Sequence, residues 1–144
     1  MSSAPNPQPA DPAAAPAAWV ETQIRVRYAE TDQMGVVYYA NFFVWFEIGR
    51  VEHLRARGFS YRDLEAEDGR FIPVVEARCR YKSPARYDDV LTVRTRLARQ
   101  RGSILDYAYE VVRAADGQLL ATGETRHVVV DKDFQPAELP SDLA

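Results

Sequence analysis

The stretch NFFVWFEIGRVEHLRARG, residues 41–58, carries the strongest structural signal in the chain. Its first half is apolar on nearly every side and is interrupted only by Glu47. A helix end without a polar face is typical of a segment that other elements enclose. The charged second half, from Arg50 to Arg57, is expected to emerge into water. Asn41 is a candidate N-cap, with a start one turn earlier as the alternative, and Gly58 is a natural stop. The sequence therefore predicts one long helix whose first half is buried.

Strand-like sequences flank this helix on both sides. Val20 to Tyr28 alternates apolar or small side chains with charged and polar ones, which is typical of a half-buried strand. Beyond the long helix, Ser60 is a candidate N-cap for a short helix that runs to Glu65. Four further alternating stretches follow, at residues 71–82, 90–99, 104–113 and 119–131.

The turns between the last three stretches are short. Arg101-Gly102 and Asp116-Gly117 are dipeptides that close tight hairpins, so these stretches should form an antiparallel meander. The order of elements is then strand, buried helix and four strands. This order predicts an α+β protein in which a five-stranded antiparallel sheet wraps around a long central helix.

The two ends of the chain lack this patterning. Residues 1–18 are rich in Pro and Ala and contain neither a positive charge nor an apolar block, so we expect a disordered tail rather than a signal peptide. Residues 136–144 are expected to form a C-terminal tail. Since 144 residues suit one domain, residues 19–135 are predicted to be a single domain.

The composition excludes several classes of protein. A net charge of −3 argues against the basic surface of a nucleic-acid binder. The longest apolar run, Phe42 to Phe46, is far too short to cross a membrane. The single cysteine, Cys79, cannot form an internal disulfide and is compatible with a reducing compartment, so a cytoplasmic location is expected.

The two histidines of the chain do not suggest a metal site. His53 falls in the outer half of the predicted helix beside Glu52 and Arg55, and is expected at the surface or at an interface. His127 lies in the last strand. Two histidines so far apart, without a pair of cysteines, do not have the spacing of metal ligands, so no metal is expected.

The segment DQMGVVYYANF, residues 32–42, joins the first strand to the long helix. It reads as Asp, two residues, Gly, two apolar residues, an aromatic residue and Tyr, a small residue, Asn and an aromatic residue. This motif resembles the 4-hydroxybenzoyl-CoA thioesterase family and, within it, the small bacterial thioesterases linked to the Tol–Pal cell-envelope system. The match in strand order covers Val20 to Asp131. The resemblance implies the hotdog fold, an acyl-CoA substrate, and a homodimer or homotetramer with active sites at the subunit interface.

The residues of the motif suit hydrolysis of a thioester. The reaction needs a base or nucleophile and donors for the developing oxyanion, and no cofactor is expected. Asp32 can supply the carboxylate, either by attacking the carbonyl or by activating water, and both routes stay open. Backbone N–H groups at a helix N-terminus are unpaired and partly positive. The resemblance makes the amide of Tyr39 the oxyanion donor, while Gly35 lets the backbone turn close to the ligand.

Other residues of the motif are candidates to contact the substrate: Val36, Val37, Tyr38 and Asn41. Many Tol–Pal-linked relatives carry His where Tyr39 stands here, which leaves an aromatic or a longer acyl group open. Glu47 is a second carboxylate of interest. We favour an ion pair with Arg50 or Arg25, and a role as base is the alternative, because a second clade of hotdog thioesterases uses a helix carboxylate.

Coenzyme A carries negative charges on its nucleotide end, so its site needs surface cations. The candidates are Lys82, Arg86 and Arg126, with Ser83 and Thr122 as neutral donors. A single hotdog subunit would also leave a sheet edge open, and pairing of two sheets edge to edge would cover it.

Two other functions compete with thioester hydrolysis. A hydratase or dehydratase of the same fold would need a histidine near the motif, and none lies in the loop or in the first half of the helix. A non-catalytic module that binds acyl-CoA or an acyl carrier protein would not need Asp32. The presence of that carboxylate favours the enzyme.

Overall fold

The computed structural model describes residues 18–140 and Leu143. Of the tail predicted at residues 1–18, residues 1–17 lie outside this described part. The elements in chain order are β1 (Val20–Arg25), the 3-10 helix η2 (Tyr28–Glu30), α1 (Asn41–Ala56), α2 (Tyr61–Ala66), β2 (Val74–Tyr81), β3 (Val90–Arg101), β4 (Ile104–Arg113) and β5 (Leu119–Val128).

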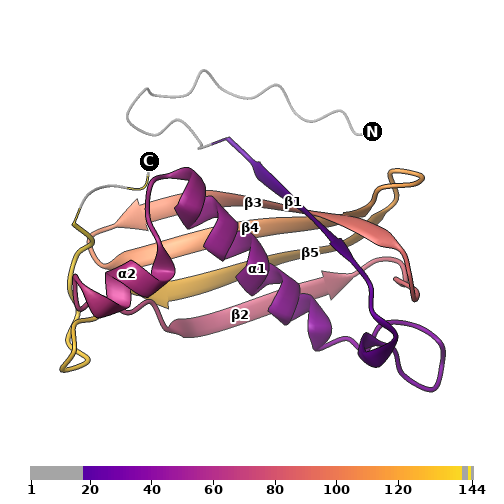
Figure 1. Ribbon diagram of the computed structural model, residues 1–144, viewed down its shortest axis with the longest axis horizontal. Coiled ribbons are helices and arrows are strands. Elements are labelled where there is room, and N and C mark those ends of the chain that lie inside the picture. Colours follow the sequence, from indigo (N-terminus) through magenta and orange to yellow (C-terminus); the bar gives the residue numbers. More distant parts are fainter. Residues whose placement is uncertain (1–17, 141–142, 144) are drawn as a thin grey trace.

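The strands form one five-stranded sheet in the order β1-β3-β4-β5-β2. Every neighbouring pair is antiparallel, and β3, β4 and β5 form the predicted meander. Figure 1 shows α1 lying diagonally across one face of this sheet. The predicted α+β architecture, with a sheet wrapped around a central helix, is therefore confirmed.

Two glycines let α1 lie close to the sheet. A Cβ atom at Gly49 in the middle of the helix would collide with the side chain of Thr95 on β3. A Cβ atom at Gly123 on β5 would collide with the ring of Phe46. That ring stacks on Tyr109 with 4.2 Å between the ring centroids. Because the space is filled by side chains packed at crystal-like density, the glycines fix how near the helix approaches the strands.

The expected burial along α1 is wrong in its second half. Arg50 and His53 were expected in water, but they are only 7% and 0% exposed. Chain segments distant in sequence cover this half: Arg57 donates to the carbonyl oxygen of the buried Leu143 at 2.9 Å. In the apolar first half, by contrast, Val44 is 49% exposed. A face of the helix that composition alone predicts to be enclosed is open within the described part of the chain.

The two predicted caps have different outcomes. Ser60 caps α2 as expected, with its side chain accepting from the amide of Asp63. The N-cap of α1 is Ala40 rather than Asn41, which is the first residue of the helix. The Asn41 side chain has another partner, the carbonyl of Glu30, so it does not cap its own helix.

Strand β2 is an edge strand and is exposed along almost its whole length. Of the apolar face that the sequence shows there, only Cys79 is half-buried, while Val75 is 53% exposed.

At the other end of the domain, the amide of Ala137 donates to the carbonyl of Val129 at 2.8 Å, so backbone hydrogen bonding continues past residue 135. No helix in the described part of the chain has the length and apolar character that a membrane crossing requires.

Candidate active site

Asp32 lies in a tight turn that its own backbone closes. The amide of Gly35 donates to the Asp32 carbonyl at 3.0 Å, and the amide of Asp32 donates to the carbonyl of Val36 at 2.9 Å. Gly35 has φ +79°, a conformation that side-chain-bearing residues rarely adopt. The amide of Met34 donates to Asp32 Oδ1 at 2.9 Å. Among the described residues, Oδ2 accepts no hydrogen bond and is free for chemistry.

Glu30 ties this turn to α1. Its buried carboxylate accepts from the amide of Arg27 at 2.7 Å and from Trp45 Nε1 at 3.2 Å. Its carbonyl accepts from the amide of Tyr38 and from Asn41 Nδ2, both at 2.9 Å. Glu30 therefore holds both ends of the loop, and Asn41, predicted to contact substrate, serves this anchor. Sequence reasoning missed Glu30 because nothing local marks a loop acid as the partner of a tryptophan fifteen positions away.

The N-terminus of α1 offers free donors beside Asp32. The first helical amides, those of Asn41, Phe42 and Phe43, donate to carbonyls three residues earlier. The amides of Tyr39 and Ala40 donate to no acceptor within the described residues, and no side chain caps the helix. Unpaired N–H groups at this position carry partial positive charge. The Tyr39 amide is thus available for the role that the resemblance gave it.

A cavity of about 370 Å³ brings the two features together. It is lined by Asp32, Val36, Val37, Tyr39, Phe42, Tyr81, Lys82, Ser83, Pro84 and Ala85. The walls are mostly apolar, with a few polar groups, as is typical of a small-molecule site. The Val37 amide donates to the carbonyl of Ala85 at 2.8 Å, which joins the loop that contains Asp32 to the segment after β2.

Tyr81 is a cavity residue that the sequence did not single out. Its hydroxyl donates to the carbonyl of Tyr39 at 3.0 Å, and its ring meets Phe42 edge to face with 5.3 Å between the centroids. Desolvation raises the pKa of Tyr81 above its usual value, so the hydroxyl keeps its proton. The contact fixes the backbone of Tyr39 across 42 positions of sequence, a separation that no local motif reveals.

The predicted site residues divide into two groups. Asp32, Val36, Val37, Tyr39, Lys82 and Ser83 line the cavity, and Gly35 shapes its turn. Tyr38, Asn41, Arg86 and Thr122 are not among the lining residues. Glu47 lines a different cavity. In the described structure it forms neither expected ion pair, because Arg25 pairs with Asp88 at 3.2 Å and Arg50 binds Tyr109 instead.

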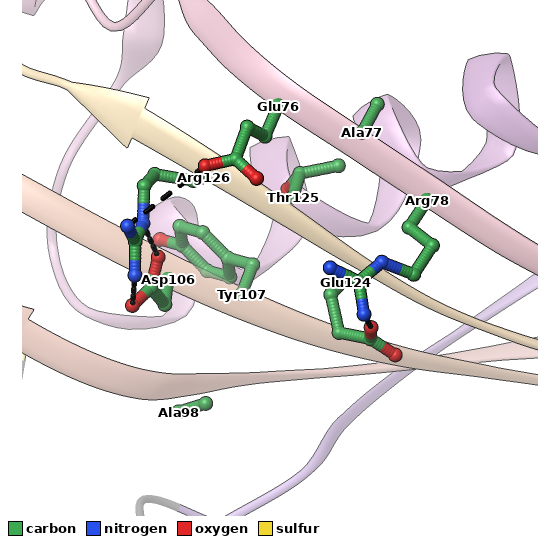
Figure 2. A pocket seen from close by; sticks show the side chains of 9 residues that line it. All are labelled: Glu76, Ala77, Arg78, Ala98, Asp106, Tyr107, Glu124, Thr125 and Arg126. Carbon is green, nitrogen blue, oxygen red and sulfur yellow. Dashed lines mark hydrogen bonds and ion pairs between the residues drawn. The ribbon is translucent and has the colours of Figure 1, made fainter.

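Arg126 lies on the face of the sheet away from α1, as Figure 2 shows. It donates to both carboxylate oxygens of Asp106, at 2.7 and 3.1 Å, and its NH1 lies 3.8 Å from Glu76. The hydrogen bond from Arg126 also lowers the pKa of Asp106. The charge of Arg126 is therefore balanced locally, in a hollow separate from the Asp32 cavity.

Comparison with known proteins places this architecture in a family. The model of the Thioesterase-like superfamily matches residues 26–144, well over half of the chain. The chain belongs to this superfamily. It is 36% identical over 121 residues to the acyl-CoA thioester hydrolase YbgC of Escherichia coli, covering 83% of this chain and 89% of YbgC.

Solved structures of the superfamily agree. The DHNA-CoA thioesterase of Staphylococcus aureus is 35% identical with a TM-score of 0.79, over 84% of this chain and 80% of that one. A 4-hydroxybenzoyl CoA thioesterase has the same fold, with a TM-score of 0.81 at 24% identity, over 88% of this chain and 96% of that one. The expected hotdog fold and the expected family are confirmed.

Proposed function

We propose that this protein hydrolyses acyl-CoA thioesters, with Asp32 as the catalytic carboxylate and the amide of Tyr39 as an oxyanion donor. One observation carries the proposal. Among the described residues, Asp32 Oδ2 has no hydrogen-bond partner and the Tyr39 amide has no acceptor, and both residues line the same cavity. The name of YbgC, an acyl-CoA thioester hydrolase, supports the same reaction.

In this mechanism the thioester carbonyl lies between the two groups. The Tyr39 amide stabilises the negative charge that develops on the carbonyl oxygen. The free Asp32 oxygen either attacks the carbonyl carbon, giving an anhydride that water then cleaves, or takes a proton from the attacking water. In both routes the thiolate of coenzyme A leaves and the acid is released. The lining residues Val36 and Val37 give the acyl group an apolar wall.

Coenzyme A is proposed to approach past Lys82 and Ser83, which lie at the cavity, with Arg86 a few residues further along the same segment. Lys82 is exposed and can meet phosphate as a point charge. Arg126 and Thr122 are weaker candidates. The guanidinium of Arg126 already holds a carboxylate, so binding a phosphate there would break an existing pair.

We also propose that the protein works as a homodimer, or as a tetramer built from dimers. Strand β2 leaves its outer edge unpaired within the described chain, and apolar Val74 and Val75 are about half exposed on it. Pairing of two β2 edges would satisfy these backbone groups. A mass near two or four times that of one chain in light scattering is the expected result. A cytoplasmic location is proposed on the free thiol of Cys79 and is checked by cell fractionation.

The rival functions fit the site less well. Hydratase chemistry needs a histidine at the substrate, but His53 and His127 are both fully buried and neither lines the Asp32 cavity. A binding module would retain its ligand without turning it over.

The test is release of free thiol from a panel of acyl-CoAs by the native protein and by Asp32→Asn. We expect turnover by the native protein and its loss in the variant. Asp131→Asn is the matched control, because Asp131 Oδ1 also accepts nearby backbone amides, in a turn outside the cavity. If the native protein binds acyl-CoA but releases no thiol, the proposed enzymatic function is wrong and the protein is a binding module.

A further inference from the structure

A second cavity beside α1 contains a buried arginine. It has a volume of about 300 Å³ and is lined by Phe43, Val44, Glu47, Arg50, Val74, Ala77 and Thr125. Arg50 lines this cavity and is only 7% exposed. Most of the other lining residues are apolar, and they come from α1 and from the edge strand β2.

A chain of hydrogen bonds holds one end of the guanidinium. Arg50 NH1 donates to the Tyr109 hydroxyl at 3.1 Å, which lies 2.6 Å from Thr125 Oγ1. Thr125 Oγ1 lies 2.8 Å from Nε2 of His127, whose Nδ1 lies 3.3 Å from the carbonyl of Ile72. A carbonyl only accepts, so Nδ1 carries the proton and Nε2 accepts from Thr125. The donors therefore point one way along the chain, from Arg50 to Ile72.

This arrangement leaves the positive charge without a partner. Burial lowers the pKa of His127 to about 4, so the ring is neutral, and the other members of the chain are neutral as well. No carboxylate of the described residues pairs with Arg50, and its buried Nε has no hydrogen-bond partner. Glu47 lines the same cavity one turn earlier but does not reach it. A buried guanidinium without an anion is unfavourable, so the fold holds it there at a cost in stability.

One terminal nitrogen of Arg50 is left to bind an anion. Within the described residues NH2 has no hydrogen-bond partner, whereas Nε is unpaired but closed to solvent, so NH2 is the N–H group that a carboxylate in the cavity would meet. NH1 is already occupied by Tyr109, and the hydrogen-bonded chain fixes its direction. The result is a preorganised cation at the bottom of an otherwise largely apolar cavity.

We propose that this cavity receives a carboxylate at the far end of the acyl group, so that the preferred substrates are monothioesters of dicarboxylic acids. This proposal rests on the thioesterase function proposed above. Both cavities flank α1 and β2: Phe42 and Tyr81 line the first, and Phe43 and Ala77 line the second. Tyr39, which holds the carbonyl in the proposed mechanism, and Arg50 are 11 positions apart, or ~16 Å along the helix axis. The Arg50 side chain leans toward the helix N-terminus and shortens that span.

The test compares two thioesters that differ only in charge. The kcat/KM of glutaryl-CoA is measured against that of its methyl ester, for the native protein, Arg50→Met and Arg25→Met. We expect the native protein to favour the free carboxylate by ~10- to 100-fold, as charge-assisted hydrogen bonds do. Arg50→Met should abolish the preference by slowing only the charged substrate. Arg25 pairs with Asp88 on the exposed surface, and its variant should retain the preference. Succinyl- and adipyl-CoA then define the best length.

Two results would overturn the proposal. One is equal use of both thioesters by the native protein. The other is an Arg50→Met variant that loses both activities equally and dissociates, because the counter-ion would then be a carboxylate from a second copy of the chain. If Arg50→Met does not fold, Arg50→Lys replaces it and should retain only part of the preference.

Binding separates this proposal from the thioesterase function itself. Calorimetry with Asp32→Asn should show tighter binding of glutaryl-CoA than of its methyl ester, a readout that needs no turnover. Cleavage of simple acyl-CoAs without any preference for the carboxylate would remove only the present inference. If the protein binds glutaryl-CoA more tightly than its methyl ester but cleaves no thioester, only the proposed enzymatic function is wrong.

Discussion

The two cavities beside α1 present opposite charges and are built in opposite ways. Asp32 is held by a turn of five residues whose hydrogen bonds are local. Arg50 is held by Tyr109, 59 positions away in sequence, and then by Thr125 and His127. A locally built group can be changed without disturbing the core. A group held by tertiary contacts cannot be changed in this way. Mutations in the Asp32 cavity should therefore lower activity with little loss of stability, whereas mutations around Arg50 should also lower the stability of the fold.

The largest expected effect lies in the Asp32 cavity. Asp32→Asn should lower kcat by ~10³-fold or more, because it removes the reacting carboxylate. The amide oxygen of Asn can still accept from Met34, so the turn persists and the melting temperature should stay within a degree or two of native. Thiol release and differential scanning fluorimetry measure the two quantities. A large drop in melting temperature would mean that the turn is not as independent as its contacts indicate.

The second prediction concerns pH and the buried histidines. Burial lowers the pKa of His53 and His127 to about 4, below the usual 6.5 of the unfolded chain. Between these values the unfolded state binds more protons, so stability is full above pH 6.5 and falls as the pH drops. At pH 5 the loss is ~2 kcal/mol for each histidine. Urea unfolding at pH 7 and pH 5 measures it.

A control for this prediction is the double variant His53→Gln/His127→Gln, which removes both titrating rings. Its stability should change much less between pH 7 and pH 5, although its value at pH 7 will be lower. The pKa values of Asp106, Asp116 and Asp131 are lowered in the folded protein. The stability that these carboxylates contribute is therefore lost mainly below about pH 4, outside the range in which the histidines titrate. An unchanged slope in the double variant would assign the pH effect to other groups.

The third prediction tests the close approach of α1 to the sheet. Gly123→Ala places a methyl group against the ring of Phe46, and overpacking of this kind costs ~1–3 kcal/mol of unfolding free energy. Phe46→Leu makes room and should reduce that cost when the two changes are combined. Urea unfolding of both single variants and the double variant gives the coupling. Additive effects would assign the cost to the backbone carbonyl of Arg78, which the same Cβ atom would also meet.

The smallest effect is expected at Tyr81, which joins the local turn to a distant strand. Tyr81→Phe loses the hydrogen bond to the Tyr39 carbonyl and should lower kcat by up to ~10-fold, the equivalent of one neutral hydrogen bond. Tyr87→Phe is the matched control, because that tyrosine is also exposed and its hydroxyl donates to no described residue. A similar loss in both variants would remove Tyr81 from the oxyanion site.

Much of the fold could be predicted from the sequence, because the residue patterns that specify its strands, turns and helix are local. Alternation marked the strands, and Gly102 and Gly117, both with positive φ, marked the two tight turns of the meander. The apolar run after residue 41 marked the central helix. The prediction that the second half of this helix is exposed was wrong. Arg50 and His53 have the polarity of surface residues, but Tyr109 and Tyr107 bind them in the buried interior.

The sequence by itself determined the hotdog architecture, the family and the loop that carries Asp32, because each is encoded in contiguous residues whose turn and helix signals act over a few positions. Only the tertiary structure decided that Glu30 anchors the loop, that Tyr81 reaches Tyr39 and that Arg126 is neutralised on the outer face. It also decided that Arg50 is buried without a counter-ion from the part of the chain that the structure describes. The physical reason is that burial and hydrogen-bond partners depend on which distant segments pack together.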